Sequence, residues 1–157
     1  MRLSSAVGDR SAELSRRWTR RLPRIWQRSM RAADTNVLVR VLARDDAEQV
    51  EIADTFMAAG AWVSLLVLQE TIWVLERAYE VDRKQQALLI GMLLEHASIA
   101  LQAPELIAAA LDTFRGRPRL EFSDCLILEL ARSSGHSPLG TFDKRLAKAP
   151  GAELLGS

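Results

Sequence analysis

The stretch that decides the fold is Ala32-Ala33-Asp34-Thr35-Asn36-Val37-Leu38. Two small apolar residues predict a short buried strand, and the apolar run over 37–42 predicts a helix capped by Thr35 or Asn36. Asp34 therefore stands between a strand and a helix. A carboxylate beside apolar segments costs free energy unless a hydrogen bond or a cation compensates its charge.

The same alternation of strands and helices continues along the chain. Helices are expected over 47–59, 67–79, 83–95, 104–114, 124–133 and 143–147, the fifth of them capped by Ser123. Strands are expected over 62–65, 99–101 and 138–141, with an edge strand over 153–155. This order predicts an α/β fold with three α/β/α layers, in which helices cover both faces of a central parallel sheet of about four to five strands.

Three further acidic residues occupy positions like that of Asp34. Glu70 and Asp124 fall in the first turns of predicted helices, and Asp143 follows a predicted strand. In parallel α/β folds, ligands bind beyond the carboxyl ends of the strands. All four carboxylates can therefore reach one edge of the sheet.

Four neighbouring carboxylates repel one another and raise one another's pKa, so the site without a cation is expected to be strained and partly protonated. A divalent cation reverses that effect. Ligands that are all oxygen atoms suit Mg²⁺ or Mn²⁺ better than zinc or copper. The neutral side chains of Asn36 and Thr141 are candidates for orienting a carboxylate or a water molecule behind the ligands.

Each acidic residue also has an ordinary explanation. Asp34 is explained as a turn residue or helix cap, Glu70 and Asp124 as partners of helix dipoles, and Asp143 as a cap. The four together are less easily dismissed than any one of them.

Composition limits the class of protein. A chain of 157 residues with 48% apolar residues is expected to form one domain with an ample core. No apolar run approaches the roughly 20 residues of a membrane span. The single cysteine, Cys125, excludes an internal disulfide and indicates a reducing compartment, which favours the cytoplasm. His96, His136 and Cys125 are too scattered for a zinc site, and the cysteine is expected to be buried and inert.

Charge is distributed unevenly along the chain. Residues 1–29 hold eight arginines against two acidic residues, whereas residues 30–157 hold 13 basic and 18 acidic residues. The body is therefore not a basic nucleic-acid binder of the usual kind, and a metal must offset its acidic site if it handles nucleic acid. Residues 1–29 are expected to be a poorly ordered extension preceding a natural start at Met30, or alternatively a functional basic arm.

Four motifs carry a family resemblance. In chain order they are Asp34-Thr35-Asn36-Val37-Leu38, Gln69-Glu70, Phe122-Ser123-Asp124-Cys125-Leu126-Ile127, and Thr141-Phe142-Asp143-Lys144-Arg145-Leu146. On these motifs the body, residues 30–157, resembles the PIN domain, and within it the VapC-type ribonuclease toxins of bacterial type II toxin–antitoxin systems. Ser123 and Cys125 depart from the pattern, since alanine is most common at both positions.

The resemblance implies an endoribonuclease that depends on Mg²⁺ or Mn²⁺. Its implied metal ligands are Asp34, Glu70, Asp124 and Asp143, with Asp34 and Asp124 as the main direct ligands. Glu70 and Asp143 would bind a second ion or position water. The implied products carry 5′-phosphate and 3′-hydroxyl ends.

The resemblance also implies protein partners. It implies a homodimer, and a cognate antitoxin whose tail fills an apolar groove and blocks the metal site. Trp73, one helical turn after Glu70, is a candidate for lining that groove. Plain core packing explains Trp73 equally well.

Three other functions compete with this one. The first is a catalytically silent PIN fold that serves as a binding scaffold, which the presence of all four acidic residues opposes. The second is a haloacid-dehalogenase-like phosphatase, which would need an acidic residue where Asn36 stands. The third is a PIN nuclease outside toxin–antitoxin systems that acts on other RNA or on DNA flaps. No motif names the RNA target.

Overall fold

The computed structural model describes residues 30–156, so the predicted extension over 1–29 lies outside the described residues. The chain divides into two compact units, Met1–Glu105 and Leu106–Ser157. Their described parts, residues 30–105 and 106–156, are called the N-terminal unit and the C-terminal unit below. No helix among residues 30–156 is long and apolar enough to cross a membrane.

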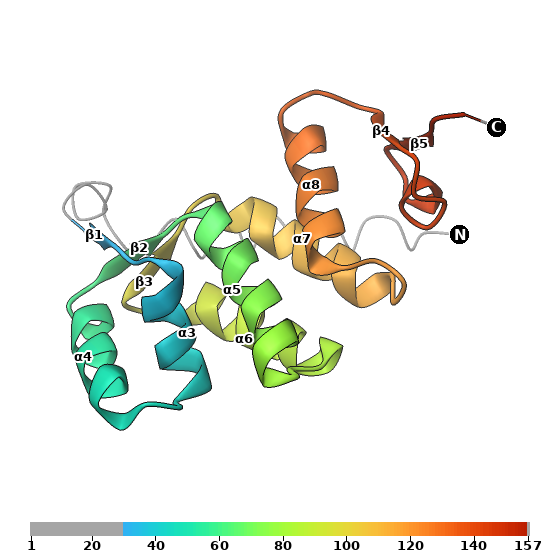
Figure 1. Ribbon diagram of the computed structural model, residues 1–157. Coiled ribbons are helices and arrows are strands. Elements are labelled where there is room, and N and C mark those ends of the chain that lie inside the picture. Colours follow the sequence, from blue (N-terminus) through green and yellow to red (C-terminus); the bar gives the residue numbers. More distant parts are fainter. Residues whose placement is uncertain (1–29, 157) are drawn as a thin grey trace, which may run out of the picture. The chain divides into compact units, whose positions relative to one another are not determined.

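The N-terminal unit is built around a three-stranded parallel sheet (Figure 1). Strand β2 (Ala61–Val63) lies between β1 (Arg31–Ala32) and β3 (Ile99–Leu101). In the register of the sheet, Trp62 pairs with Ala32 on one side and with Ala100 on the other. Helices occupy the connections: α3 (Thr35–Ala43), α4 (Ala47–Ala58), α5 (Leu65–Tyr79) and α6 (Arg83–Glu95).

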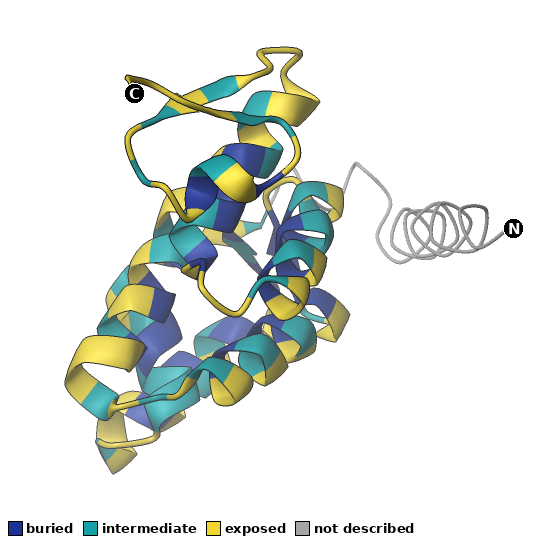
Figure 2. Ribbon diagram, turned by 90° about the vertical axis from the view of Figure 1, so that its right-hand side faces the viewer, coloured by how far each residue is buried: buried dark blue, intermediate teal, exposed yellow. Residues whose placement is uncertain are grey.

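The core of this unit lies between the sheet and these helices. Helix α3 packs against α4 and α5, while α4 contacts β2 and α6 contacts β3. Each helix buries one face and exposes the other, as the alternating colours of Figure 2 show. Leu38, Val63, Leu68 and Ile90 are fully buried.

The helices of this unit begin at side chains that cap them. Asp34, Asp46, Ser64 and Asp82 each accept a hydrogen bond from the backbone N–H three residues later. Asp34 therefore caps α3, and the prediction of Thr35 or Asn36 as the cap is wrong by one or two positions. All of these are good capping residues, so propensity alone does not select among them.

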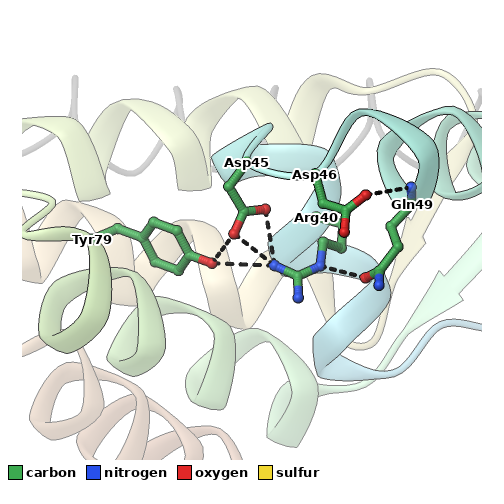
Figure 3. Close-up of polar contacts among 5 residues, drawn as sticks. All are labelled: Arg40, Asp45, Asp46, Gln49 and Tyr79. Carbon is green, nitrogen blue, oxygen red and sulfur yellow. Dashed lines mark hydrogen bonds and ion pairs between the residues drawn. The ribbon is translucent and has the colours of Figure 1, made fainter.

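A polar network ties the start of α4 to the end of α5 (Figure 3). The Arg40 guanidinium donates to Asp45 at 2.7 Å, and the Tyr79 hydroxyl donates to the same Asp45 oxygen at 2.5 Å. The hydrogen bond from Tyr79, followed by those from Arg40, lowers the pKa of Asp45. The same bond to Asp45 raises the pKa of Tyr79. This network holds the loop between α3 and α4 against α5.

The C-terminal unit contains most of α7 (Pro104–Gly116), followed by α8 (Phe122–Ser133), β4 (Leu139–Thr141), the 3₁₀ helix η1 (Leu146–Lys148) and β5 (Ala152–Leu154). Strands β4 and β5 pair in parallel, with Gly140 opposite Glu153. A Cβ atom at Gly140 would lie 3.1 Å from Leu155 Cδ1, so glycine permits this close approach. Helix α8 packs on β4, and Phe122 meets Phe114 edge-on at 5.7 Å between ring centroids.

The predicted α/β class and the parallel strand pairing are confirmed. Among residues 30–156, the N-terminal unit holds a three-stranded sheet and the C-terminal unit holds a two-stranded sheet. Helix α8 begins at Phe122 with Glu121 as its N-cap, so the predicted cap at Ser123 is wrong. The predicted helix over 143–147 is a turn followed by η1.

Candidate functional site

Two of the four predicted site residues, Asp34 and Glu70, lie in the N-terminal unit, and each has a contact at the start of α3. Asp34 follows β1, and its Oδ1 accepts a hydrogen bond from the Val37 backbone N–H at 2.9 Å. The Thr35 hydroxyl donates to Glu70 Oε2. Helix α5 thus brings Glu70 to the residue next to Asp34, and both carboxylates are exposed.

The position of Glu70 on its helix differs from the prediction. Helix α5 begins at Leu65 behind the cap Ser64, so Glu70 lies in the second turn and not in the first. The favourable effect of the helix dipole on a carboxylate falls off within the first turn. A dipole partner is therefore the wrong explanation for Glu70, whose observed partner is the Thr35 hydroxyl.

The other two predicted site residues lie in the C-terminal unit. Asp124 falls in the first turn of α8, as predicted, and its Oδ2 accepts from the Glu121 backbone N–H at 3.0 Å. Asp143 follows β4, and its own backbone N–H donates to Thr141 Oγ1 at 3.0 Å. Thr141 therefore fixes the turn that presents the Asp143 carboxylate.

Arg145 connects the carboxylates of this unit. Its backbone N–H donates to Asp143 Oδ1 at 2.7 Å, and its guanidinium lies 3.3 Å from Asp143 Oδ2. The backbone N–H and then the guanidinium hold the pKa of Asp143 below its ordinary value. The pKa of Arg145 is raised mainly by Asp143, with smaller electrostatic contributions from Asp124 and Glu121.

This arrangement corrects one prediction about the site. Mutual repulsion was expected to raise carboxyl pKa values and leave the site partly protonated. At Asp143 the pKa shifts in the opposite direction, because the backbone N–H and the guanidinium of Arg145 stabilise the charged form. Asp143 is therefore ionised at neutral pH without a bound cation.

Each unit thus contains two of the acidic residues, Asp34 and Glu70 in the N-terminal unit and Asp124 and Asp143 in the C-terminal unit. Among residues 30–156, no three His, Cys, Asp or Glu side chains form a group that could hold a metal ion. The pairs nevertheless fit Mg²⁺ or Mn²⁺ by their chemistry, because carboxylate oxygens are the ligands those ions prefer. Magnesium keeps several waters and often takes only one or two carboxylates from the protein.

Three residues near the acidic pairs were not predicted from the sequence as part of the site. Thr35 holds Glu70, the backbone of Glu121 holds Asp124, and Arg145 holds Asp143. The spacing of Glu121 and Asp124 is that of a capping box, which was a usable signal in the sequence. Thr35 gave no comparable signal, since its partner is distant in the chain.

The remaining candidates are placed as follows. Asn36 is exposed in the first turn of α3, beside Thr35. Trp73 keeps 50% of its surface exposed, with the Arg77 guanidinium 5.6 Å from its ring centroid. Plain core packing is therefore the wrong explanation for Trp73. Cys125 is fully buried, as predicted.

A parallel α/β fold with carboxylates after its strands and near its helix starts defines a class of proteins suited to divalent-cation chemistry. Comparison with known families makes this specific: residues 32–152 match the PIN domain, and the chain belongs to that family. The three-layer α/β/α fold predicted from the sequence is consistent with this family. PIN domains are generally metal-dependent nucleases. A search of curated proteins finds no match to the chain.

Proposed function

We propose that this PIN domain is a divalent-metal-dependent endoribonuclease and the toxin component of a type II toxin–antitoxin system. The observation that carries the proposal is the pairing of carboxylates inside the family-matched region. Asp34 precedes Thr35 in the chain, and the Thr35 hydroxyl donates to Glu70. Asp143 and Asp124 both raise the pKa of Arg145. These four carboxylates are the proposed ligands of Mg²⁺ or Mn²⁺.

The contacts of the carboxylates are compatible with this role. A carboxylate offers about four lone-pair positions, so the single capping bond of Asp34 leaves oxygen positions for a cation. The same holds for Asp124, which accepts from Glu121 through Oδ2. Asp34 and Asp124 are the proposed main ligands, and Glu70 and Asp143 are proposed to bind a second ion or to position water.

The neighbouring residues have positioning roles in this proposal. Thr35 fixes the rotamer of Glu70, and Thr141 fixes the turn at Asp143. Asn36 is proposed to orient a carboxylate or a water from the first turn of α3. A bound Mg²⁺ or Mn²⁺ would lower the pKa of its water and polarise the scissile phosphate. Arg145 contacts both oxygens of Asp143, so a cation that bound Asp143 would have to displace the guanidinium from Oδ2.

The proposal extends to partners and location. A cognate antitoxin and a homodimer follow from the resemblance to the VapC-type toxins. Leu66 is 82% exposed and Trp73 is 50% exposed on α5, which carries Glu70, so an apolar partner segment has a surface there. A cytoplasmic location is proposed from the use of a single cysteine.

The test is cleavage of several RNAs by the full chain with Mg²⁺, Mn²⁺ or EDTA. Asp34→Asn and Asp124→Asn should each abolish cleavage, whereas Asp112→Asn, on the exposed surface of α7, should retain it. Thermal unfolding of the same variants checks that they fold. Cleavage that persists in EDTA, or in either site variant, would refute the proposed ligand set.

The toxin role needs a separate readout. Expression of the wild-type chain should arrest growth of a bacterial host, and Asp124→Asn should not. Cleavage in vitro without growth arrest would favour a PIN nuclease outside toxin–antitoxin systems. RNA binding without cleavage by the folded wild-type chain would favour the silent scaffold.

A further inference from the structure

The outer face of helix α4 carries a row of side chains with mixed chemistry. Glu48, Ile52 and Phe56 follow one another at every fourth position, so they lie in one line along the helix. Ile52 is 65% exposed, and Glu48 is exposed beside it. Within residues 30–156, the Glu48 carboxylate has no hydrogen bond or ion pair. An apolar side chain and an unpaired carboxylate therefore stand together on a helix face that faces outward.

A pocket opens beside this row. It has a volume of about 490 Å³ and is lined by Arg44, Ala47, Val50, Glu51, Asp54 and Thr55. Arg44 pairs with Asp54 at 2.9 Å, whereas the Glu51 carboxylate has no ion pair in the described part of the chain. The volume lies within the roughly 300–1,000 Å³ of pockets that take a whole small molecule. One large side chain therefore fits into it, next to a carboxylate that is free to pair with a cation.

The first described residues of the chain lie at one end of this row. In β1, the Arg31 guanidinium lies 4.2 Å from the centroid of the Phe56 ring, which is a cation–π contact. The Met30 side chain lies against Gly60, directly after α4: a Cβ atom at Gly60 would be 3.2 Å from Met30 Cε. Both β1 and α4 belong to the N-terminal unit (Figure 1). The segment that precedes Met30 is therefore attached where the row ends.

Charge makes that segment, residues 1–29, complementary to the helix face. It holds eight arginines against two acidic residues. Helix α4 holds Glu48, Glu51 and Asp54 and no basic residue. Arg31 already shows how an arginine binds to this face, since it stacks on Phe56. A second arginine placed one or two turns further along the row would meet Ile52 and Glu48.

The length of the segment is sufficient for this contact. Helix α4 has 12 residues, which corresponds to about 18 Å, and an extended chain covers that distance in about six residues. Arg28 and Arg24 precede Met30 by two and six residues, with Trp26 between them. Both charged and aromatic side chains of the segment can therefore reach the whole row and the pocket.

We propose that residues 1–29 dock on the outer face of α4 in the same chain, with arginines pairing with Glu48 and Glu51 and an apolar side chain covering Ile52. A tethered segment acts at an effective concentration in the millimolar range, so weak surface contacts suffice to hold it. The docking site contains none of the proposed metal ligands. Its test therefore uses neither RNA nor a metal, and its outcome is independent of the ribonuclease proposal.

The first experiment measures how fast trypsin cuts the full chain within residues 1–29, since trypsin cuts after arginine and a docked segment is protected. Mass spectrometry assigns each cut, and thermal unfolding checks that every variant folds. The test variants are the double variant Glu48→Gln/Glu51→Gln and the single variant Ile52→Gln. The matched controls are Glu105→Gln/Asp112→Asn on α7, which removes the same charge at exposed positions, and Leu88→Gln on α6, where the leucine is 62% exposed.

The double variant should be cut within residues 1–29 about fivefold faster than the wild type, as expected for the loss of two surface ion pairs. Ile52→Gln should be cut about threefold faster, because the apolar contact is lost. Raising the ionic strength from about 0.05 M to about 0.5 M should bring the wild-type rate towards that of the double variant, since salt screens the ion pairs. Both control variants should be cut at the wild-type rate.

The second experiment identifies what lies on the face. A photo-reactive benzoylphenylalanine replaces Ile52, and equal amounts of isotope-labelled and unlabelled chains are mixed before illumination. Docking within one chain should give crosslinks from position 52 to residues 1–29 in which both peptides carry the same label.

Three results would overturn the proposal. The first is an equal rate of cutting in the wild type and the Glu48→Gln/Glu51→Gln variant. The second is a set of crosslinks that joins labelled to unlabelled peptides, which would assign the face to a second copy of the chain. The third is crosslinking from position 52 only to residues 30–157, which would show that residues 1–29 do not cover the face.

Discussion

Replacing Asp124 by asparagine and by alanine separates its role as a metal ligand from its role in α8. Its Oδ2 accepts from the Glu121 backbone N–H, and asparagine can keep this bond through its amide oxygen. Asparagine loses a first-turn charge effect of about 0.3–1 kcal/mol. It also relieves like-charge repulsion of about 0.2–0.5 kcal/mol from neighbouring acidic residues. The free energy of unfolding should therefore change by less than about 1 kcal/mol, between a loss of about 0.8 kcal/mol and a gain of about 0.2 kcal/mol.

Alanine removes the hydrogen bond as well as the charge. Loss of one intramolecular hydrogen bond typically costs about 0.5–1.5 kcal/mol. The expected order of stability without metal is therefore wild type about equal to Asp124→Asn, and both above Asp124→Ala. Both variants should lose cleavage completely.

Urea unfolding in EDTA measures these differences, with cleavage assayed on the same preparations. A destabilisation of Asp124→Asn as large as that of Asp124→Ala would show that the charge, not the hydrogen bond, supports the helix. That outcome would contradict the assignment of Asp124 as a carboxylate kept for a cation. Retained cleavage by Asp124→Asn would also contradict the assignment of Asp124 as a metal ligand.

Three further outcomes are expected. Tyr79→Phe removes the largest cause of the lowered Asp45 pKa, so that pKa should rise. A carboxyl group with a lowered pKa in the folded state stabilises the protein above the ordinary carboxyl pKa, and this stabilisation is lost as the pH falls. The difference in the free energy of unfolding between variant and wild type, measured with urea, should therefore be largest near pH 7 and shrink below about pH 4. Leu68→Ala should lower the free energy of unfolding by about 2–5 kcal/mol, since that side chain is fully buried; a smaller loss would mean that α5 packs loosely. Saturating Mn²⁺, at about 100 times its dissociation constant, should raise the stability of the wild type by about 2.7 kcal/mol, and calorimetry should show no such gain in Asp34→Asn.

The sequence predicted the elements better than their assembly. Helix 83–95 and strand 99–101 were predicted with their observed bounds, because each has a clear apolar pattern between polar ends. The strands contain only two or three residues, too few for a pattern that identifies a partner strand. The pairing of β2 with both β1 and β3 joins segments far apart in the chain, and no short motif encodes it.

The sequence predicted the elements beside which the candidate residues stand better than it predicted the contacts of those residues. The positions of Asp34 and Asp143 after strands followed from local pattern alone. The hydroxyl that donates to Glu70 belongs to Thr35, which is 35 residues away in the chain. This hydrogen bond depends on how α3 packs against α5. The pKa of Asp143 could not be predicted from the count of acidic residues, since a backbone N–H is the largest cause of its shift.

Charge has to be counted where the ligand binds and not over the whole body. The excess of acidic residues in 30–157 argued against a basic nucleic-acid surface, yet one pocket gathers Arg117, Arg119, Arg145 and Lys148. Exposed charges are screened beyond about 8–10 Å at physiological salt, so the local balance of charge matters more to a pocket than the total over the body. The motif around Asp143 holds both signs within a few residues. A nuclease needs this arrangement, because its acidic site must accept a cation while the adjacent strand of phosphates requires positive charge.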